Sequence, residues 1–333
     1  MASIMTNASA LTALQSLNAT NKNLAITQSR ISTGYRVAEA SDNAAYWSIA
    51  TTMRSDHKAL STVQDSLGLG ASKVDTAYTG MQKAIDTVND IKVKLVAANG
   101  ASAADKEKID VEIKALQGQL KSYADAATFS GANWLSTDTT TGHTAAGTFN
   151  DVKIVASFIR NGSGSVSLGT IDVKVQDIKL YDAASATTGL TDGILDAFRL
   201  GTDGTRIAAA TAGAIGTDLA GQTFTVSTMA LTSGSLTATD AQITKMLTVT
   251  EAALKEMTTA ATNLGAAKSR IDLQKTFTSS LMDSIDRGIG QLVDADMNKE
   301  STRLQALQVQ QQLGIQALSI ANSSSQNILS LFR

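Results

Sequence analysis

The 333-residue chain contains no cysteine and no proline, and only 4% of its residues are aromatic. Without cysteine it can form no disulfide, no thiolate metal site and no cysteine nucleophile. Proline removes an amide donor and breaks helices, so its absence suits long, uninterrupted helices. The scarcity of aromatic side chains argues against a ligand pocket with aromatic walls.

Charge is sparse and balanced, with 28 Lys and Arg against 30 Asp and Glu and a formal net charge of -2. The basic residues form no block that could neutralise a phosphate backbone, so we expect no nucleic-acid partner. No apolar run approaches the length of a transmembrane helix, so we expect no membrane partner. The first residues carry neither a basic segment nor a continuous apolar one, so we expect no cleavable secretory signal.

Three stretches show the period of an amphipathic helix. Apolar residues recur at steps of three and four over residues 49–95, 109–123 and 243–292. Asn43 offers an N-cap before the first stretch, and Gly100 offers a left-handed stop after it. Each apolar stripe is narrow, and a long helix with one apolar face is stable only against a partner. We therefore expect an antiparallel helical bundle built from both ends of the chain.

Between these helices the composition changes to Gly, Thr, Ser and Ala. Over residues 166–175 the apolar period shortens to two, which is typical of a strand. Phe224 and Val226 indicate another strand, and residues 194–200 indicate a short helix. We expect a β-containing module on the surface.

The outermost segments, residues 1–33 and 300–333, are amphipathic and almost free of charge. Asn, Ser, Thr and Gln fill the face opposite the apolar stripe, which suits burial among copies of the same helix better than a solvated surface. The predicted assembly residues are the large apolar side chains of these stripes: Leu11, Leu14, Leu17, Leu24, Ile31, Leu304, Leu307, Leu313, Leu318, Ile320, Ile328 and Leu331.

These patterns predict a mainly α protein with a β-containing insert. Its architecture is a long antiparallel helical bundle or coiled coil from both chain ends, plus a small middle surface domain. The expected regions are terminal helices at 1–40 and 288–333, a long-helix bundle at 41–137 and 239–287, and a variable surface-exposed domain at 138–238.

Catalytic or metal-ligating constellations are not evident in the sequence. His57 and His143 are the only histidines, and neither stands in a metal-ligand spacing. Asp294 and Asp296 resemble a carboxylate pair, but short acidic residues between two helices serve more naturally as caps. We therefore expect no enzyme activity, no metal and no cofactor.

Two stretches carry a recognisable family pattern. ISTGYRVAEASDNAAYWSIATTMRSD, residues 31–56, has a Ser-x-Gly-x-Arg turn followed by Asp-Asn-Ala-Ala, and LGAAKSRID, residues 264–272, has Leu-Gly-Ala-x-x-x-Arg-Ile. Together with the final helix at residues 307–333, they resemble the terminal regions of bacterial flagellins. The motif residues are Gly34, Arg36, Asp42, Asn43, Ala44, Ala45 and Arg270. The sequence departs from the pattern at Tyr46-Trp47, where many members have Gly.

The resemblance implies a structural subunit that self-assembles into the flagellar filament for swimming motility, with the terminal helices innermost. It implies secretion through the flagellar type III export apparatus with an export chaperone, and an extracellular place in the filament. Implied partners are other copies, sister flagellins, and hook-associated and cap proteins. The alternatives are the hook-filament junction protein, which is similar at both termini, and a cytoplasmic coiled-coil scaffold, which would carry charged heptads to its ends.

Overall fold

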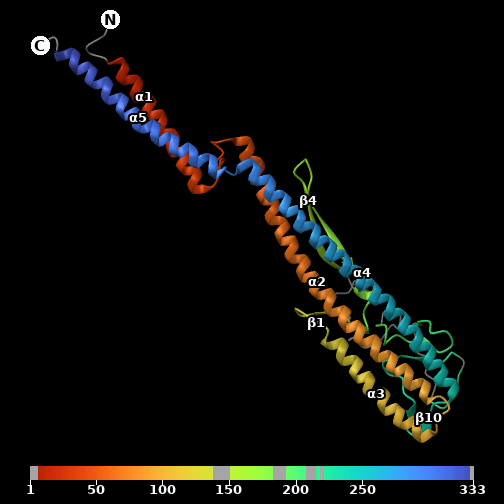
Figure 1. Ribbon diagram of the computed structural model, residues 1–333. Coiled ribbons are helices and arrows are strands. Elements are labelled where there is room, and N and C mark those ends of the chain that lie inside the picture. Colours follow the sequence, from red (N-terminus) through yellow and green to blue (C-terminus); the bar gives the residue numbers. More distant parts are fainter. Residues whose placement is uncertain are drawn as a thin grey trace. The chain divides into compact units, whose positions relative to one another are not determined.

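The computed structural model describes residues 7–137, 151–182, 193–207, 215–217, 219 and 221–330, with only the backbone for residues 324–330. Within these residues it contains five α-helices: α1 (Ala8–Thr33), α2 (Ala44–Ala98), α3 (Ala103–Ala126), α4 (Asp240–Val293) and α5 (Met297–Ser330) (Figure 1). The chain divides into two compact units, one from residues 1–59 and 280–333 and the other from residues 60–279. Both α2 and α4 contribute to both units.

Local side-chain chemistry sets the ends of the long helices. The Asn43 side chain accepts a hydrogen bond from the Tyr46 amide (3.1 Å) and caps the start of α2. After α2, Gly100 adopts a left-handed φ of 77°, which most residues avoid. At the start of α4, Thr239 accepts a bond from the Gln242 amide while the Gln242 side chain accepts one from the Thr239 amide. This reciprocal capping box fixes where α4 begins.

The core of the unit formed by residues 60–279 lies between α2, α3 and α4. Large apolar residues, each at most 1% exposed, line it: Leu67, Val74, Met81, Val88, Ile91 and Leu95 from α2, Ile113 and Leu120 from α3, and Ile243, Val249, Met257, Leu264 and Ile271 from α4. These residues follow the predicted stripes, and Figure 1 shows α2 and α4 running in opposite directions. The prediction of a mainly α, antiparallel bundle is confirmed.

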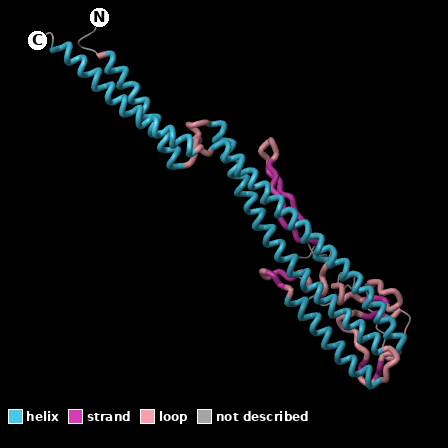
Figure 2. The backbone as a smooth tube through the Cα atoms, viewed as in Figure 1, coloured by secondary structure: helices cyan, strands magenta, loops and turns pink. Residues whose placement is uncertain are grey.

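Short strands occupy the middle of the chain (Figure 2). The described strands are β1 (Thr128–Phe129), β2 (Ala132–Asn133), β3 (Ser136–Thr137), β4 (Val152–Arg160), β5 (Val166–Val173), β6 (Tyr181–Asp182), β7 (Arg199–Leu200), β8 (Thr223–Phe224), β9 (Thr232–Ser233) and β10 (Leu236–Thr237). The pairs β1–β2, β4–β5, β7–β8 and β9–β10 are antiparallel, and β3–β6 is parallel. The β4–β5 hairpin is the longest of them.

Two strand predictions hold and one helix prediction is wrong. β5 and β8 lie where the period of two and Phe224 place them. Val226, however, lies in the turn after β8, and Val175 begins a short 3-10 helix, η1 (Val175–Asp177). The predicted helix at residues 194–200 is a single turn that leads into β7. Tertiary packing overrides the local pattern there, because Arg199 extends into the core to reach an acidic residue of α4.

The strand-bearing segment shares one hydrophobic core with the helices. Its buried residues Ile154, Val175, Leu195, Val226 and Leu231 belong to the same cluster as the stripes of α2, α3 and α4. Among the described residues, the strand-bearing segment and the helices therefore form one hydrophobic core, and the domain boundaries at residues 138 and 238 stay a prediction.

Polar groups of α3 fasten the end of this segment to the bundle. The carboxylate of Asp110, which is 1% exposed, accepts bonds from the Leu231 amide (2.6 Å), the Thr232 hydroxyl (2.9 Å) and the Lys114 ammonium (2.7 Å). Burial of Asp110 opposes its ionisation, but these three donors outweigh it and lower the pKa of the carboxyl. Gln117 donates two more bonds to backbone carbonyls of the same segment.

Candidate functional site

The candidate site is the pair of terminal helices, α1 and α5, which pack side by side. At one end the Asn7 side chain donates to the Ala321 carbonyl (2.9 Å), and at the other Arg30 pairs with Glu300 (3.3 Å). A third hydrogen bond joins the helices between these points. The start of α1 thus lies beside the end of α5, so the pair is antiparallel.

Within one copy, α1 and α5 cover part of each other's apolar stripes. Of the predicted assembly residues, Leu307 is buried at 7% exposure. Leu17, Leu24, Ile31, Leu304 and Leu318 are half-buried. Leu17 packs so closely on α5 that a Cβ added to Gly314 would lie 3.2 Å from it. Part of each stripe therefore has a partner inside the chain, which corrects the expectation that other copies bury the whole stripe.

The remaining predicted residues that the structure describes are exposed: Leu11 (59%), Leu14 (44%), Leu313 (58%) and Ile320 (69%). Ile26 and Ile315 are also exposed and were missed because they lie beside the predicted stripes. The Ile328 side chain and all of Leu331 lie outside the described residues. Clusters of exposed large apolar residues mark interaction surfaces.

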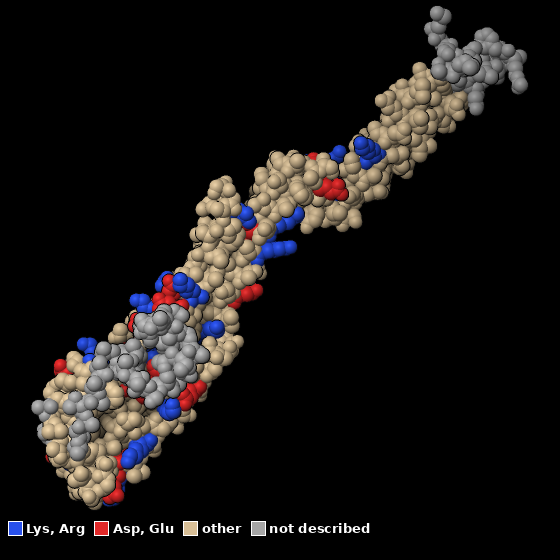
Figure 3. Space-filling view, turned by 180° about the vertical axis from the view of Figure 1, so that it is seen from behind, with Lys and Arg blue, Asp and Glu red and all other residues tan. Residues whose placement is uncertain are grey.

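Charge is nearly absent from this helix pair. Residues 1–21 and 304–332 contain no Lys, Arg, Asp or Glu. In Figure 3 the surface of the pair, at the upper right, is almost entirely free of charged side chains. Burying such a surface against another protein leaves few charges to desolvate, and charge depletion is characteristic of interface cores.

Two predicted motif residues join the chain after α1 to the end of α4. Gly34 ends α1 with a φ of 75°, and its carbonyl accepts a bond from the Ala295 amide (2.9 Å). The Arg36 guanidinium donates to the carbonyls of Leu292 (2.9 Å) and Gln291 (3.3 Å). A cationic donor at the end of a helix satisfies otherwise unpaired carbonyls and interacts favourably with the helix dipole.

The Asp-Asn-Ala-Ala motif builds the start of α2. The Asp42 carboxylate accepts two backbone amides of the preceding turn (3.0 and 3.2 Å), and Asn43 caps the helix. Ala44 and Ala45 form its first turn with exposed side chains, followed by Trp47 at 37% exposure. These motif residues hold the backbone in place and do not form a ligand pocket.

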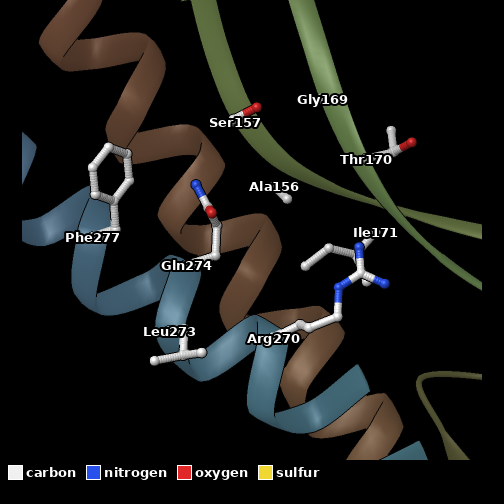
Figure 4. Close-up of a pocket in the computed structure, with 9 residues that line it drawn as sticks. All are labelled: Ala156, Ser157, Gly169, Thr170, Ile171, Arg270, Leu273, Gln274 and Phe277. Atoms are coloured by element: carbon white, nitrogen blue, oxygen red, sulfur yellow. The ribbon is translucent and has the colours of Figure 1, made fainter. Parts of the chain in front are cut away.

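Arg270 belongs to the unit formed by residues 60–279. It lies on α4 and lines a shallow groove against the β4–β5 hairpin, with Gln274, Leu273 and Phe277 on the same helix. Figure 4 shows Arg270 and Gln274 reaching toward the hairpin, with the Arg270 guanidinium beside Ile171.

The candidate chemical residues have structural roles where they are described. His57 on α2 lies 3.2 Å from the Asp286 carboxylate on α4. Asp296 caps the start of α5 as predicted, because its side chain accepts bonds from the Asn298 and Lys299 amides. The Asp294 amide donates to the Gly290 carbonyl and extends the hydrogen bonding of α4. His143 is outside the described residues. Among the residues that the structure describes, no three His, Cys, Asp or Glu side chains gather as metal ligands. Nor does any helix in this part of the chain combine the length and hydropathy of a membrane span.

Comparison with known proteins identifies the family to which the chain is similar. The model of the bacterial flagellin N-terminal helical region matches residues 4–140, and that of the bacterial flagellin C-terminal helical region matches residues 247–332. Flagellin C of Rhizobium meliloti strain 1021 is 48% identical over 342 residues, and a flagellin of Brucella melitensis biotype 1 is 50% identical over 333 residues. Both alignments cover 100% of each chain. The chain therefore belongs to the bacterial flagellin family.

Proposed function

We propose that copies of this chain assemble into the flagellar filament through the exposed apolar side chains of the α1–α5 pair. As a flagellin, the chain is a structural subunit of the extracellular filament that drives swimming. The main support for this proposal is that Leu11, Leu313 and Ile320 are each more than half exposed in one copy. Each such side chain contributes about 1.5–3 kcal/mol when a neighbour buries it fully, so several together favour association strongly.

We further propose that residues 1–40 and 288–333 form the inner core of the filament, residues 41–137 and 239–287 form the bundle around it, and residues 138–238 face solvent. The support is the distribution of apolar surface. The bundle buries most of its stripe residues within one copy, although Leu273 (69%) and Phe277 (59%) of α4 are also exposed. Of the predicted assembly residues in the described part of the terminal pair, only Leu307 is buried.

Family membership also supports a structural and not a catalytic role. We infer that the partners besides other copies are the flagellar type III export apparatus, an export chaperone, sister flagellins, and hook-associated and cap proteins. Full-length similarity to flagellins favours the filament subunit over the hook-filament junction protein. The charge-free stretch at residues 304–332 argues against a scaffold with charged heptads.

A single charge placed among the exposed apolar side chains of the α1–α5 pair tests whether they form the assembly surface. Ile320→Lys would bring an unpaired ammonium into the proposed interface, which costs several kcal/mol. We expect this variant to keep the helical content of wild-type monomer but to fail to elongate filament seeds. Val111→Lys is the matched control, because Val111 is 65% exposed on α3, outside the terminal pair. Elongation by Ile320→Lys at the wild-type rate would contradict the proposal.

A further inference from the structure

The turn that closes the β4–β5 hairpin contains an Asn-Gly pair in an exposed setting. Figure 1 shows this hairpin as the green strands beside α4, and residues 161–168 are all exposed. The Asn161 amide donates to the Ser165 carbonyl (2.9 Å), and the Gly164 amide donates to the Asn161 carbonyl (2.8 Å). The Asn161 side-chain nitrogen donates to the Ser165 hydroxyl (3.2 Å).

We propose that Asn161 is a site of spontaneous covalent modification. The backbone nitrogen of Gly162 attacks the side-chain Cγ of Asn161 and forms a succinimide ring. The Cγ–Nδ2 bond breaks, the attacking nitrogen loses its proton, and ammonia leaves. Water then adds to either ring carbonyl and opens the ring, which leaves aspartate or isoaspartate. Water is the only co-reactant.

Glycine after the asparagine removes the main steric barrier to this attack. It has no Cβ to block the approach, and its backbone reaches conformations that other residues avoid. The space around Gly162 is open as well, since a Cβ added there would meet no atom within 4 Å. Among the described residues, none accepts a hydrogen bond from the Gly162 amide, so its nitrogen is available to react.

The second Asn-Gly pair, Asn99-Gly100, provides an internal control. The Gly100 amide donates to the Asp240 carboxylate (3.2 Å), and the Asn99 amide donates to the Val96 carbonyl (3.2 Å). Attack by the Gly100 nitrogen requires the loss of its hydrogen bond and a change in the turn that ends α2. The glycine amide is therefore hydrogen-bonded in Asn99-Gly100, whereas the Gly162 amide has no such bond among the described residues.

Modification would alter the hairpin tip specifically. It adds one negative charge beside Arg160, whose guanidinium lies 5.8 Å from the centre of the Phe158 ring. Isoaspartate also lengthens the main chain by a methylene, so the two backbone hydrogen bonds of Asn161 cannot both keep their geometry. We expect the tip to loosen while the core residues of β4 and β5 stay buried.

Peptide mapping by mass spectrometry of the folded, full-length chain tests the proposal. After incubation at mildly alkaline pH, peptides with Asn161 should gain the mass of an amide-to-acid change at least about tenfold faster than peptides with Asn99, a difference of ~1.4 kcal/mol in barrier. In urea, where neither turn is formed, the two rates should converge. Asn161→Gln should abolish the first signal and leave the second unchanged.

Two results would overturn the proposal. One is an intact Asn161 in the folded chain after the urea-treated chain has converted. The other is equal conversion of Asn99 and Asn161 in the folded chain.

Discussion

Arg199 on β7 and Glu256 on α4 form a two-point ion pair, with Nη1–Oε1 and Nη2–Oε2 distances of 2.9 and 2.7 Å. Arg199 is 1% exposed, and the Glu256 side chain is 39% exposed. Arg206 also donates to Glu256, so one carboxylate pairs with two guanidinium groups. This cluster of ion pairs fastens the strand-bearing segment to α4.

Glu256→Gln should destabilise the unit formed by residues 60–279, because it leaves the Arg199 charge buried without a counter-charge. We expect a loss of about 1–3 kcal/mol, less than for a fully buried pair since Glu256 is partly solvated. Urea unfolding of the monomer measures it. Glu251→Gln on the same helix is the control: it breaks the exposed pair with Lys92 and should cost under about 1 kcal/mol. Equal losses in the two variants would show that the buried pair has no special role.

At acidic pH, wild type and Glu256→Gln should have similar free energies of unfolding. Burial of Glu256 opposes its ionisation, but bonds from Arg199 and Arg206 outweigh it and lower the pKa below the ordinary 4.5. A carboxyl with a lowered folded-state pKa contributes stability that is complete above its unfolded pKa and is lost as pH falls through its folded one. The difference in unfolding free energy between wild type and Glu256→Gln should thus be constant near neutral pH and shrink below pH 4.5. A gap that stays constant at strongly acidic pH would contradict this assignment.

The sequence predicted the helices well because each carries a long apolar stripe and clear end signals, such as Asn43 and Gly100. It predicted the strand segment poorly. Arginine side chains are mostly exposed in proteins. Only the partner Glu256, far along the chain, explains why Arg199 is buried. Residues 194–200 accordingly look helical in isolation but end as a strand in the fold.

The candidate site was predictable in composition but not in detail. The charge-free ends and their leucines identified α1 and α5 as unusual helices. No sequence period shows that Leu307 is covered by the partner helix while Leu313 stays exposed, because that division depends on how the two helices rotate against each other.

Two glycine-to-alanine substitutions, one after the end of α2 and one inside α3, should change stability with opposite signs. Gly100→Ala should cost about 1 kcal/mol, because Gly100 has a left-handed φ of 77°. Gly118→Ala lies within α3 and should stabilise by about 0.5–1 kcal/mol. An added Cβ meets no atom within 4 Å at either site, so backbone conformation alone decides the sign. Thermal unfolding of both variants provides the measurement, and a shift in the same direction would contradict the assigned conformations.

Trp47 should report assembly. It is 37% exposed beside Tyr46, at 42%, whereas Trp134 is 5% exposed in the core. In Trp134→Phe, the emission of Trp47 should move to shorter wavelength as filaments form, because neighbouring copies exclude water from the start of α2. In Trp47→Phe, the emission of Trp134 should not change. A Trp47 spectrum that is the same in monomer and filament would place the start of α2 outside the subunit interface.

Leu313→Ala tests most directly whether the exposed face of the α1–α5 pair drives assembly. Leu313 is 58% exposed in one copy, so its truncation should leave the melting temperature of the monomer unchanged. Truncating a leucine that becomes buried typically costs about 2–5 kcal/mol, and each ~1.4 kcal/mol is tenfold in an equilibrium constant, so the critical concentration should rise at least about tenfold. Val111→Ala, on the exposed face of α3, should change neither quantity. The decisive measurement is therefore the critical concentration of seeded growth beside calorimetry of the monomer. A tenfold or larger rise at unchanged melting temperature is predicted; wild-type growth by Leu313→Ala, or a lowered melting temperature of its monomer, would contradict it.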